Sequence, residues 1–130
     1  MKKVITYGTF DTFHYGHIEI FRRAKEFGDH LTVAVSTDNF NKLKNKISVF
    51  PFDKRKEWVE SINLVDLVIP EYSWEQKESD VINYNVDTFV IGDDWKGKFD
   101  YLSCNVVYIP RTEIISSTEI RKILNGMAST

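Results

Sequence analysis

The amino-acid sequence predicts an α/β fold in which helices cover both faces of a doubly wound parallel sheet. Five short segments rich in β-branched residues alternate along the chain with segments of helical periodicity. The five segments are almost continuously apolar, which is typical of parallel strands buried on both faces. A length of 130 residues allows one core, so residues 1–130 are expected to form a single Rossmann-like domain of about five strands.

The strands are predicted from their β-branched and aromatic content. In chain order they are 3–7, 31–35, 66–70, 88–92 and 105–109. The intervening segments are long enough for helical crossovers, and such crossovers join parallel strands.

The first helix is predicted within 17–28, where Ile18, Phe21 and Ala24 share an apolar stripe that Phe27 can extend. Gly28 is a candidate for the left-handed residue that ends this helix.

Three further helices are predicted at about 53–63, 75–84 and 117–126. Asp53 is the expected N-cap of the second helix, with Trp58, Val59 and Ile62 on its buried face. Ser117 or Thr118 would open the last helix, which Gly126 would close.

Composition argues against several classes of function. The net charge of −2 is unlike that of a general nucleic-acid binder, and no apolar run approaches the roughly 20 residues that cross a bilayer. The first residues, MKKVITYG, do not resemble a signal peptide, and Cys104 is the single cysteine, so no internal disulfide is possible. We therefore expect a cytoplasmic protein that binds neither nucleic acid nor membrane.

Ligands of doubly wound sheets bind beyond the carboxyl ends of the strands. The candidate site segments are therefore 8–17, 36–46, 74–77, 92–95 and 111–118. The second of these carries Lys42, Lys44 and Lys46 without an acidic neighbour, which suits either a solvated loop or a phosphate site.

The stretch GTFDTFHYGH (8–17) has the strongest chemical pattern. Gly8 and Thr9 suit a turn whose N–H and hydroxyl groups bind phosphate, and His14 and His17 could stabilise charge that develops during phosphoryl or nucleotidyl transfer. His14 could instead cap the turn while His17 fills the core. Asp11, His14 and His17 could also hold zinc, but the sequence contains no second ligand cluster, so we predict no resident metal.

These motifs give the chain a family resemblance. GTFDTFHYGH resembles the signature of the H-x-G-H nucleotidyltransferase superfamily. With STDNF, NKLKNK, DKRKEW, PEYSWEQK, GDDWKGKFDYL and PRTEIISSTEI, almost the whole chain is similar to the CTP:glycerol-3-phosphate cytidylyltransferase family.

The resemblance implies roles for individual residues. The implied nucleotide-binding positions are Thr9, Phe10, His14, Tyr15, Gly16, His17, Lys46, Asp94, Arg111, Thr112, Ser116, Ser117 and Thr118. The implied catalytic group is His14, His17, Lys44 and Arg111, and the implied acceptor site contains Lys44 and Lys77 with Asp11, Arg55 and Trp74. For Asp11 and Asp94 turn chemistry is an alternative, for Arg55 a salt bridge, and for Trp74 simple packing.

By resemblance, the reaction would join CTP and sn-glycerol 3-phosphate to give CDP-glycerol for a wall or capsule polymer. Mg²⁺ would be bound mainly through the CTP phosphates, and the enzyme would be a homodimer. The chain departs from the family at Asn63, where arginine is common, and at Ile114, where glycine is common. Another small phosphorylated acceptor therefore remains an alternative, as does a nucleotide sensor without turnover.

Overall fold

The computed structural model describes residues 1–11 and 15–110 and, for Tyr15 and Gly16, the backbone alone. Its elements are β1 (Lys3–Gly8), α1 (Tyr15–Lys25), β2 (His30–Ser36), α2 (Asp38–Leu43), α3 (Phe52–Glu60), β3 (Leu67–Glu71), α4 (Gln76–Asn83), β4 (Thr88–Gly92), the 3₁₀ helix η1 (Asp93–Trp95) and β5 (Asn105–Ile109). The predicted helix at 117–126 lies outside the described residues.

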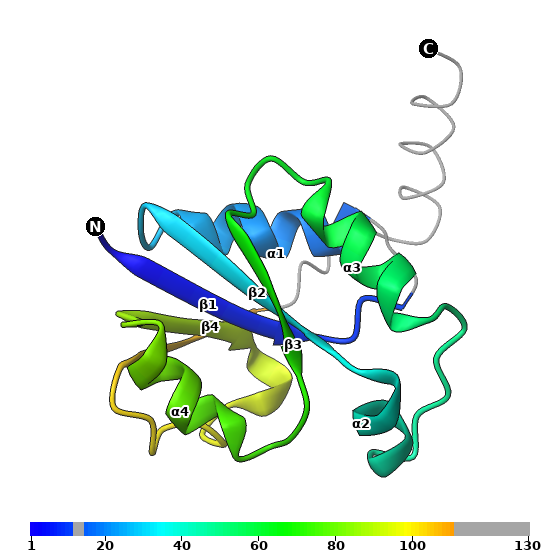
Figure 1. Ribbon diagram of the computed structural model, residues 1–130. Helices are drawn as coiled ribbons and strands as arrows, with labels where there is room; N and C mark the ends of the chain where they lie inside the picture. Colours follow the sequence, from blue (N-terminus) through cyan, green and yellow to red (C-terminus); the bar gives the residue numbers. More distant parts are fainter. Residues whose placement is uncertain (12–14, 111–130) are drawn as a thin grey trace.

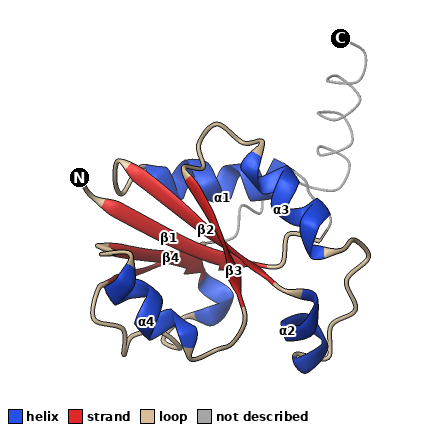
Figure 2. Ribbon diagram, viewed as in Figure 1, coloured by secondary structure: helices blue, strands red, loops and turns tan. Residues whose placement is uncertain are grey.

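The five strands form one parallel sheet in the order β3-β2-β1-β4-β5. Helices α1 and α3 cover one face and α4 covers the other (Figure 1; Figure 2). This confirms the predicted doubly wound fold. The chain order reverses between β1 and β4, so the carboxyl ends of these strands mark the expected ligand site.

The core has two parts because successive strand residues face opposite sides of the sheet. Val4 of β1 packs with Phe21 of α1 and Val59 of α3, whereas Ile5 belongs to the cluster around Val81 of α4. Every predicted strand is present within one or two residues of its expected limits.

The first helix differs from the prediction at its end. Helix α1 ends at Lys25, and Phe27 is 41% exposed, so Phe27 does not extend the buried stripe. Gly28 does not have the expected left-handed conformation; among the described glycines, only Gly97 has a positive φ. A glycine is needed at position 28 because a Cβ there would lie 2.6 Å from the Lys2 carbonyl oxygen.

The expected N-cap of the second predicted helix is also wrong. Helix α3 begins at Phe52 with Pro51 as its N-cap residue, and Asp53 lies inside the first turn. The side chain of Asp38 supplies the missing acceptor, since the Phe52 N–H donates to its carboxylate over 3.2 Å. A residue distant in sequence thus replaces a local cap.

Two short helices lie in segments that the sequence indicated only as strand-following loops. Helix α2 begins after Thr37, whose hydroxyl accepts a hydrogen bond from the Phe40 N–H, and η1 directly follows β4. Across the described ranges, none of the helices has the length and apolar character needed to cross a membrane.

Candidate active site

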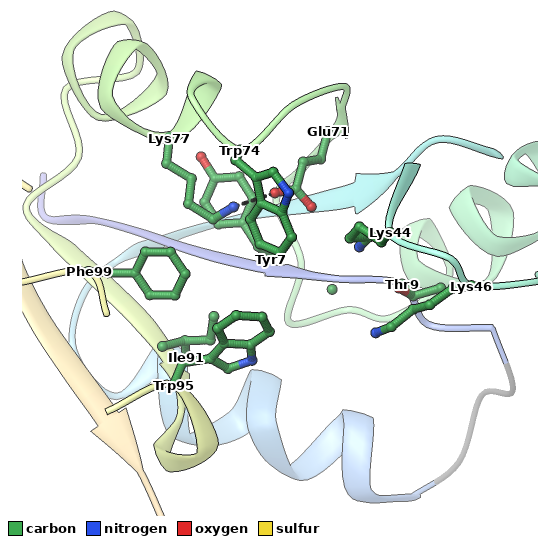
Figure 3. Close-up of a pocket in the computed structure, with 11 residues that line it drawn as sticks. Tyr7, Thr9, Lys44, Lys46, Glu71, Trp74, Lys77, Ile91, Trp95 and Phe99 are labelled. Atoms are coloured by element: carbon green, nitrogen blue, oxygen red, sulfur yellow. Dashed lines mark hydrogen bonds and ion pairs between the residues drawn. The ribbon is translucent and has the colours of Figure 1, made fainter. Parts of the chain in front are cut away.

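A pocket of about 280 Å³ lies beyond the carboxyl ends of β1, β3 and β4, next to the point where the chain order reverses. It is lined by Tyr7, Gly8, Thr9, Lys44, Lys46, Glu71, Trp74, Lys77, Ile91, Trp95 and Phe99 (Figure 3). The structure therefore brings Thr9, Lys44, Lys46, Trp74 and Lys77 together from three of the predicted site segments.

Three lysines line this pocket, and each comes from a different local structure. Lys44 is the C-cap residue of α2, Lys46 follows in the next turn, and Lys77 lies in the first turn of α4. The Lys44 Nζ lies 4.5 Å from the centre of the Phe40 ring. Burial lowers the pKa of Lys44, and the nearby Lys46 and Lys77 charges lower it further, against an opposing effect of Glu71.

Glu71 is a pocket residue that the sequence interpretation missed. It is the last residue of β3, it is 3% exposed, and its Oε2 lies 2.5 Å from the Nζ of Lys77. Burial raises the pKa of Glu71, and Lys77 and Lys44 oppose that rise. Its place at the carboxyl end of a predicted strand could have indicated it, but its pairing with Lys77 depends on tertiary packing.

Aromatic rings form much of the pocket wall. Trp74 packs edge-on against Phe40 and lies 5.7 Å from the Trp95 ring, centre to centre. Trp95 in turn packs on Phe99. Of these rings, the sequence interpretation named only Trp74 as a site residue, although Trp95 lies in the candidate segment 92–95.

The turn after β1 is shaped by Phe10. Phe10 has a φ of 53°, its side chain is buried, and a Cβ at Gly8 would lie 2.7 Å from the Phe10 ring. Gly8 is therefore needed to admit this ring. The ring also packs edge-on against His17 at 5.2 Å between centres, so Phe10 helps to orient the described histidine of the H-x-G-H motif.

The Thr9 side chain is tied to the segment that carries the lysines. Its Oγ1 lies 3.2 Å from the Ser36 hydroxyl, which donates to the Asn41 side-chain oxygen over 2.7 Å. The Lys46 N–H donates to the backbone carbonyl of the same asparagine. These bonds fix the turn after β1 relative to the lysine loop.

Arg55 does not line the pocket. It is fully buried, and its guanidinium donates to the carbonyls of Thr9, Ser36 and Phe50 over 2.7 to 3.0 Å. It also pairs with the Asp38 carboxylate at 2.8 Å. Arg55 therefore holds the loops around the pocket through buried hydrogen bonds, without lining the pocket itself.

Asp11 and Asp94 also do not line the pocket. The Asp11 carboxylate accepts hydrogen bonds from the N–H groups of Val49 and Phe50 at 2.8 and 2.9 Å, which is turn chemistry. Asp94 is exposed on η1. Within the described part of the chain, no three His, Cys, Asp or Glu residues form a group suited to a metal.

Several predicted site residues lie outside the described residues: His14, Arg111, Thr112, Ser116, Ser117 and Thr118. Tyr15 and Gly16 are described as the first backbone positions of α1. The structure thus places the predicted lysines and the first turn, and it does not describe the predicted segment 111–118.

The described pocket is chemically suited to a phosphorylated ligand. Three ammonium groups and one carboxylate give its lining an excess of positive charge. Aromatic rings beside Lys44 and Lys77 reduce contact with water, which strengthens the attraction between ammonium groups and a dianionic phosphate.

Comparisons with known proteins agree with this geometry. A family model described as "Cytidylyltransferase-like" matches residues 5–123. The chain is 57% identical over 128 residues to the glycerol-3-phosphate cytidylyltransferase of Staphylococcus aureus, covering 97% of each chain. It is 56% identical over 129 residues to the enzyme of the same name from Bacillus subtilis, covering 98% of this chain and 100% of that one.

A solved structure extends the comparison to three dimensions. The lipopolysaccharide core biosynthesis protein of Thermoplasma volcanium aligns with a TM-score of 0.75 and 26% sequence identity. The alignment covers 87% of this chain and 99% of that chain. The arrangement of the sheet and its helices is therefore similar to that of an experimentally determined structure.

Proposed function

This chain belongs to the cytidylyltransferase-like family, and on that premise we propose that it transfers the cytidylyl group of CTP to sn-glycerol 3-phosphate. The products are CDP-glycerol and pyrophosphate. The observation that carries the proposal is the convergence of Lys44 and Lys77 in one pocket at the carboxyl edge of the sheet. Identity of 56–57% over nearly the full length to two glycerol-3-phosphate cytidylyltransferases supports the choice of both substrates.

The transfer requires no covalent enzyme intermediate, because the acceptor phosphate is already anionic. One of its oxygens forms a bond to the α-phosphorus of CTP, and the bond from that phosphorus to the bridging oxygen of the β-phosphate breaks. The electron pair leaves with pyrophosphate. Most of what the protein can supply is positioning and charge stabilisation.

The pocket lysines divide this work. Lys44 and Lys77 would form the acceptor site, with the acceptor phosphate on Lys44, while Lys46 and Thr9 would hold the CTP phosphates (Figure 3). His17, oriented by Phe10, would donate to phosphate oxygens as charge develops. His14, Arg111 and the 116–118 segment, outside the described residues, keep their implied roles as further donors.

Mg²⁺ would accompany CTP. The pocket carboxylate, Glu71, is already paired with Lys77, so the described lining fits an ion bound mainly through phosphate oxygens. When bound there, Mg²⁺ neutralises part of the triphosphate charge. We also propose a homodimer and a cytoplasmic location; a single cysteine is compatible with a reducing compartment.

A pyrophosphate-release assay tests the function directly. With Mg²⁺ and glycerol 3-phosphate, CTP should be turned over with a kcat/KM of about 10⁴ M⁻¹s⁻¹ or more, and ATP far more slowly. Equal turnover of ATP and CTP would contradict the assignment of the nucleotide. Nucleotide binding without any turnover would favour a sensor.

A panel of acceptors separates the nucleotide assignment from the acceptor assignment. If glycerol 3-phosphate is inert while another small phosphate reacts with CTP, the cytidylyl transfer stands and the acceptor is wrong. Asn63, exposed beyond the end of α3, is then the described position to change first, as Asn63→Arg.

A further inference from the structure

The ammonium group of Lys77 occupies a cage of three aromatic rings at the inner end of the pocket. Its Nζ lies 4.8 Å from the centre of the Tyr7 ring, 4.9 Å from Trp74 and 5.3 Å from Phe99. Figure 3 shows these rings around the end of the lysine side chain, with Glu71 joined to it by an ion pair. Lys77 is 2% exposed, so this ammonium is held almost entirely within protein.

Aromatic rings and a carboxylate around one point are the groups that recognise an ammonium or trimethylammonium head. Without Lys77, the cage would have the chemistry of a binding site for the cationic end of an amino-alcohol phosphate. The chain fills that site with its own cation.

We propose that Lys77 acts as a charge filter: by filling the aromatic cage beside Glu71, it excludes amino-alcohol phosphates and leaves the pocket selective for uncharged polyol phosphates. This inference rests on the proposed function, because it concerns the acceptor of that same reaction. The Lys77 ammonium is held in place by Glu71 and by the rings of Tyr7, Trp74 and Phe99.

The charges in the pocket make the filter effective. The acceptor phosphate is attracted by Lys44, and in the absence of CTP also by the charge of Lys46, whichever head group it carries. A cationic head directed toward the cage meets the Lys77 ammonium in a region with little water, where repulsion is weakly screened. A polyol head carries no charge to be repelled, and its hydroxyls can donate to the Glu71 carboxylate.

The cage also explains why a lysine is stable at this buried position. Three ring faces and one ion pair replace the water that the ammonium loses on burial. The Tyr7 ring is itself fixed, since its hydroxyl donates to Asp80 over 2.6 Å. The filter is therefore built into the walls of the pocket.

Binding of two ligands without CTP tests the proposal. Glycerol 3-phosphate and choline phosphate carry the same phosphate and differ in head group. By calorimetry, the unmodified protein should bind choline phosphate at least about 30-fold more weakly than glycerol 3-phosphate, because a poorly screened contact between like charges is strongly unfavourable. In Lys77→Ala, choline phosphate should bind more tightly than glycerol 3-phosphate. Truncation removes about as many heavy atoms as a trimethylammonium group contains, so the choline head can enter the cage.

Two variants serve as controls. Lys46→Ala removes a lysine from the same pocket but not from the cage, so it should weaken both ligands by a similar factor. Glu71→Gln combined with Lys77→Ala removes the carboxylate as well, and most of the gained choline phosphate affinity should disappear. Tetramethylammonium, which carries no phosphate, should raise the melting temperature of Lys77→Ala and not that of the unmodified protein.

The proposal is overturned if the unmodified protein binds the two phosphates within about threefold of each other, since repulsion between two poorly screened cations should lower the affinity by more than that. It is also overturned if folded Lys77→Ala gains no affinity for choline phosphate. Should Lys77→Ala fail to fold, the comparison of ligands on the unmodified protein decides. Loss of the proposed function shows separately, as absence of CTP turnover with glycerol 3-phosphate.

Discussion

At the scale of residues, the pocket depends on lysines whose surroundings differ. Lys77 is enclosed by rings and paired with Glu71, whereas Lys44 lies at the pocket wall over Phe40. Burial destabilises the charged form of Lys44 and so lowers its pKa. A bound anion would stabilise that charged form. In the unliganded pocket the main acidic group near both lysines is Glu71, so a phosphate dianion would supply the missing negative charge.

Lys44→Ala should raise the KM for glycerol 3-phosphate roughly 10- to 100-fold, as expected when a charge-assisted hydrogen bond is lost. The KM for CTP should change much less, because the proposed contact is to the acceptor. Steady-state kinetics with each substrate varied in turn would measure both values. Lys42→Ala provides the matched control, since Lys42 is exposed on α2 and does not line the pocket. Equal increases for both substrates would contradict the assignment of Lys44.

At the scale of elements, helix α3 and the turns of the site are joined by one buried side chain. Arg55 of α3 donates to the Thr9 carbonyl in the turn after β1 and to the Ser36 carbonyl at the end of β2. At the opposite end of the sheet, near the amino ends of β1 and β2, the α1 to β2 connection is held by close backbone contact. There the Asp29 N–H donates to the Lys2 carbonyl over 2.8 Å, beside Gly28. A buried arginine thus holds the loops at the carboxyl end of the sheet, whereas backbone contact holds the connection at the amino end.

Gly28→Ala should destabilise the protein by about 1–3 kcal/mol, the usual cost of an added methyl group in a well-packed place. The new Cβ would lie 2.6 Å from the Lys2 carbonyl oxygen and 2.8 Å from a methyl group of Val4, so the backbone must move. Urea denaturation would measure the change in the free energy of unfolding. Gly92→Ala is the matched control, because nothing lies within 4 Å of a Cβ built at Gly92. Equal stability of the two variants would show that the α1 to β2 connection yields without cost.

At the scale of the whole molecule, the two ends of the sheet use their charged side chains differently. Lysines gather in the pocket beyond the carboxyl ends of the strands. Near the amino ends, the carboxylates of Asp29, Asp66 and Asp87 accept hydrogen bonds from the N–H groups of Lys2, Leu31 and Lys3. Each carboxylate precedes one strand and holds the beginning of its neighbour. This arrangement anchors the sheet at one end and leaves the other end positively charged for phosphate.

Asp66→Asn should lower the melting temperature at pH 7. The difference in melting temperature from the unmodified protein should become smaller in acid. Burial tends to raise the pKa of Asp66, but hydrogen bonds from Lys25 and the Leu31 N–H outweigh it, and the net pKa is lowered. A carboxylate with a lowered pKa stabilises the fold above its unfolded pKa of about 4, and this contribution is lost as the pH falls through the folded value. Melting curves from pH 7 to pH 3 would measure the difference. Exposed Asp93→Asn should show little change, and a loss for Asp66→Asn that persists unchanged in acid would contradict the linkage.

The arrangement of strands and most helices was predictable because it depends on local patterns. The apolar runs at 31–35 and 88–92 became β2 and β4, and Phe21 and Ala24 of the predicted stripe are buried on the inner face of α1. Parallel order then placed the segments that carry Thr9, Lys44 and Lys77 at one edge. Their meeting in one pocket therefore follows from topology that the sequence already specified.

Other features required the folded chain, because they join residues far apart in sequence. Asp38 replaced Asp53 at the start of α3, Arg55 turned inward to carbonyls of other loops, and Gly28 was needed for contact with Lys2. The cage around Lys77 draws its rings from β1, from the β3 to α4 connection and from the segment after η1. Periodicity and caps act over a few residues, so the sequence by itself determined the fold and the edge where phosphate chemistry gathers. Long-range packing alone decided which charges are paired, which are buried and which face the pocket.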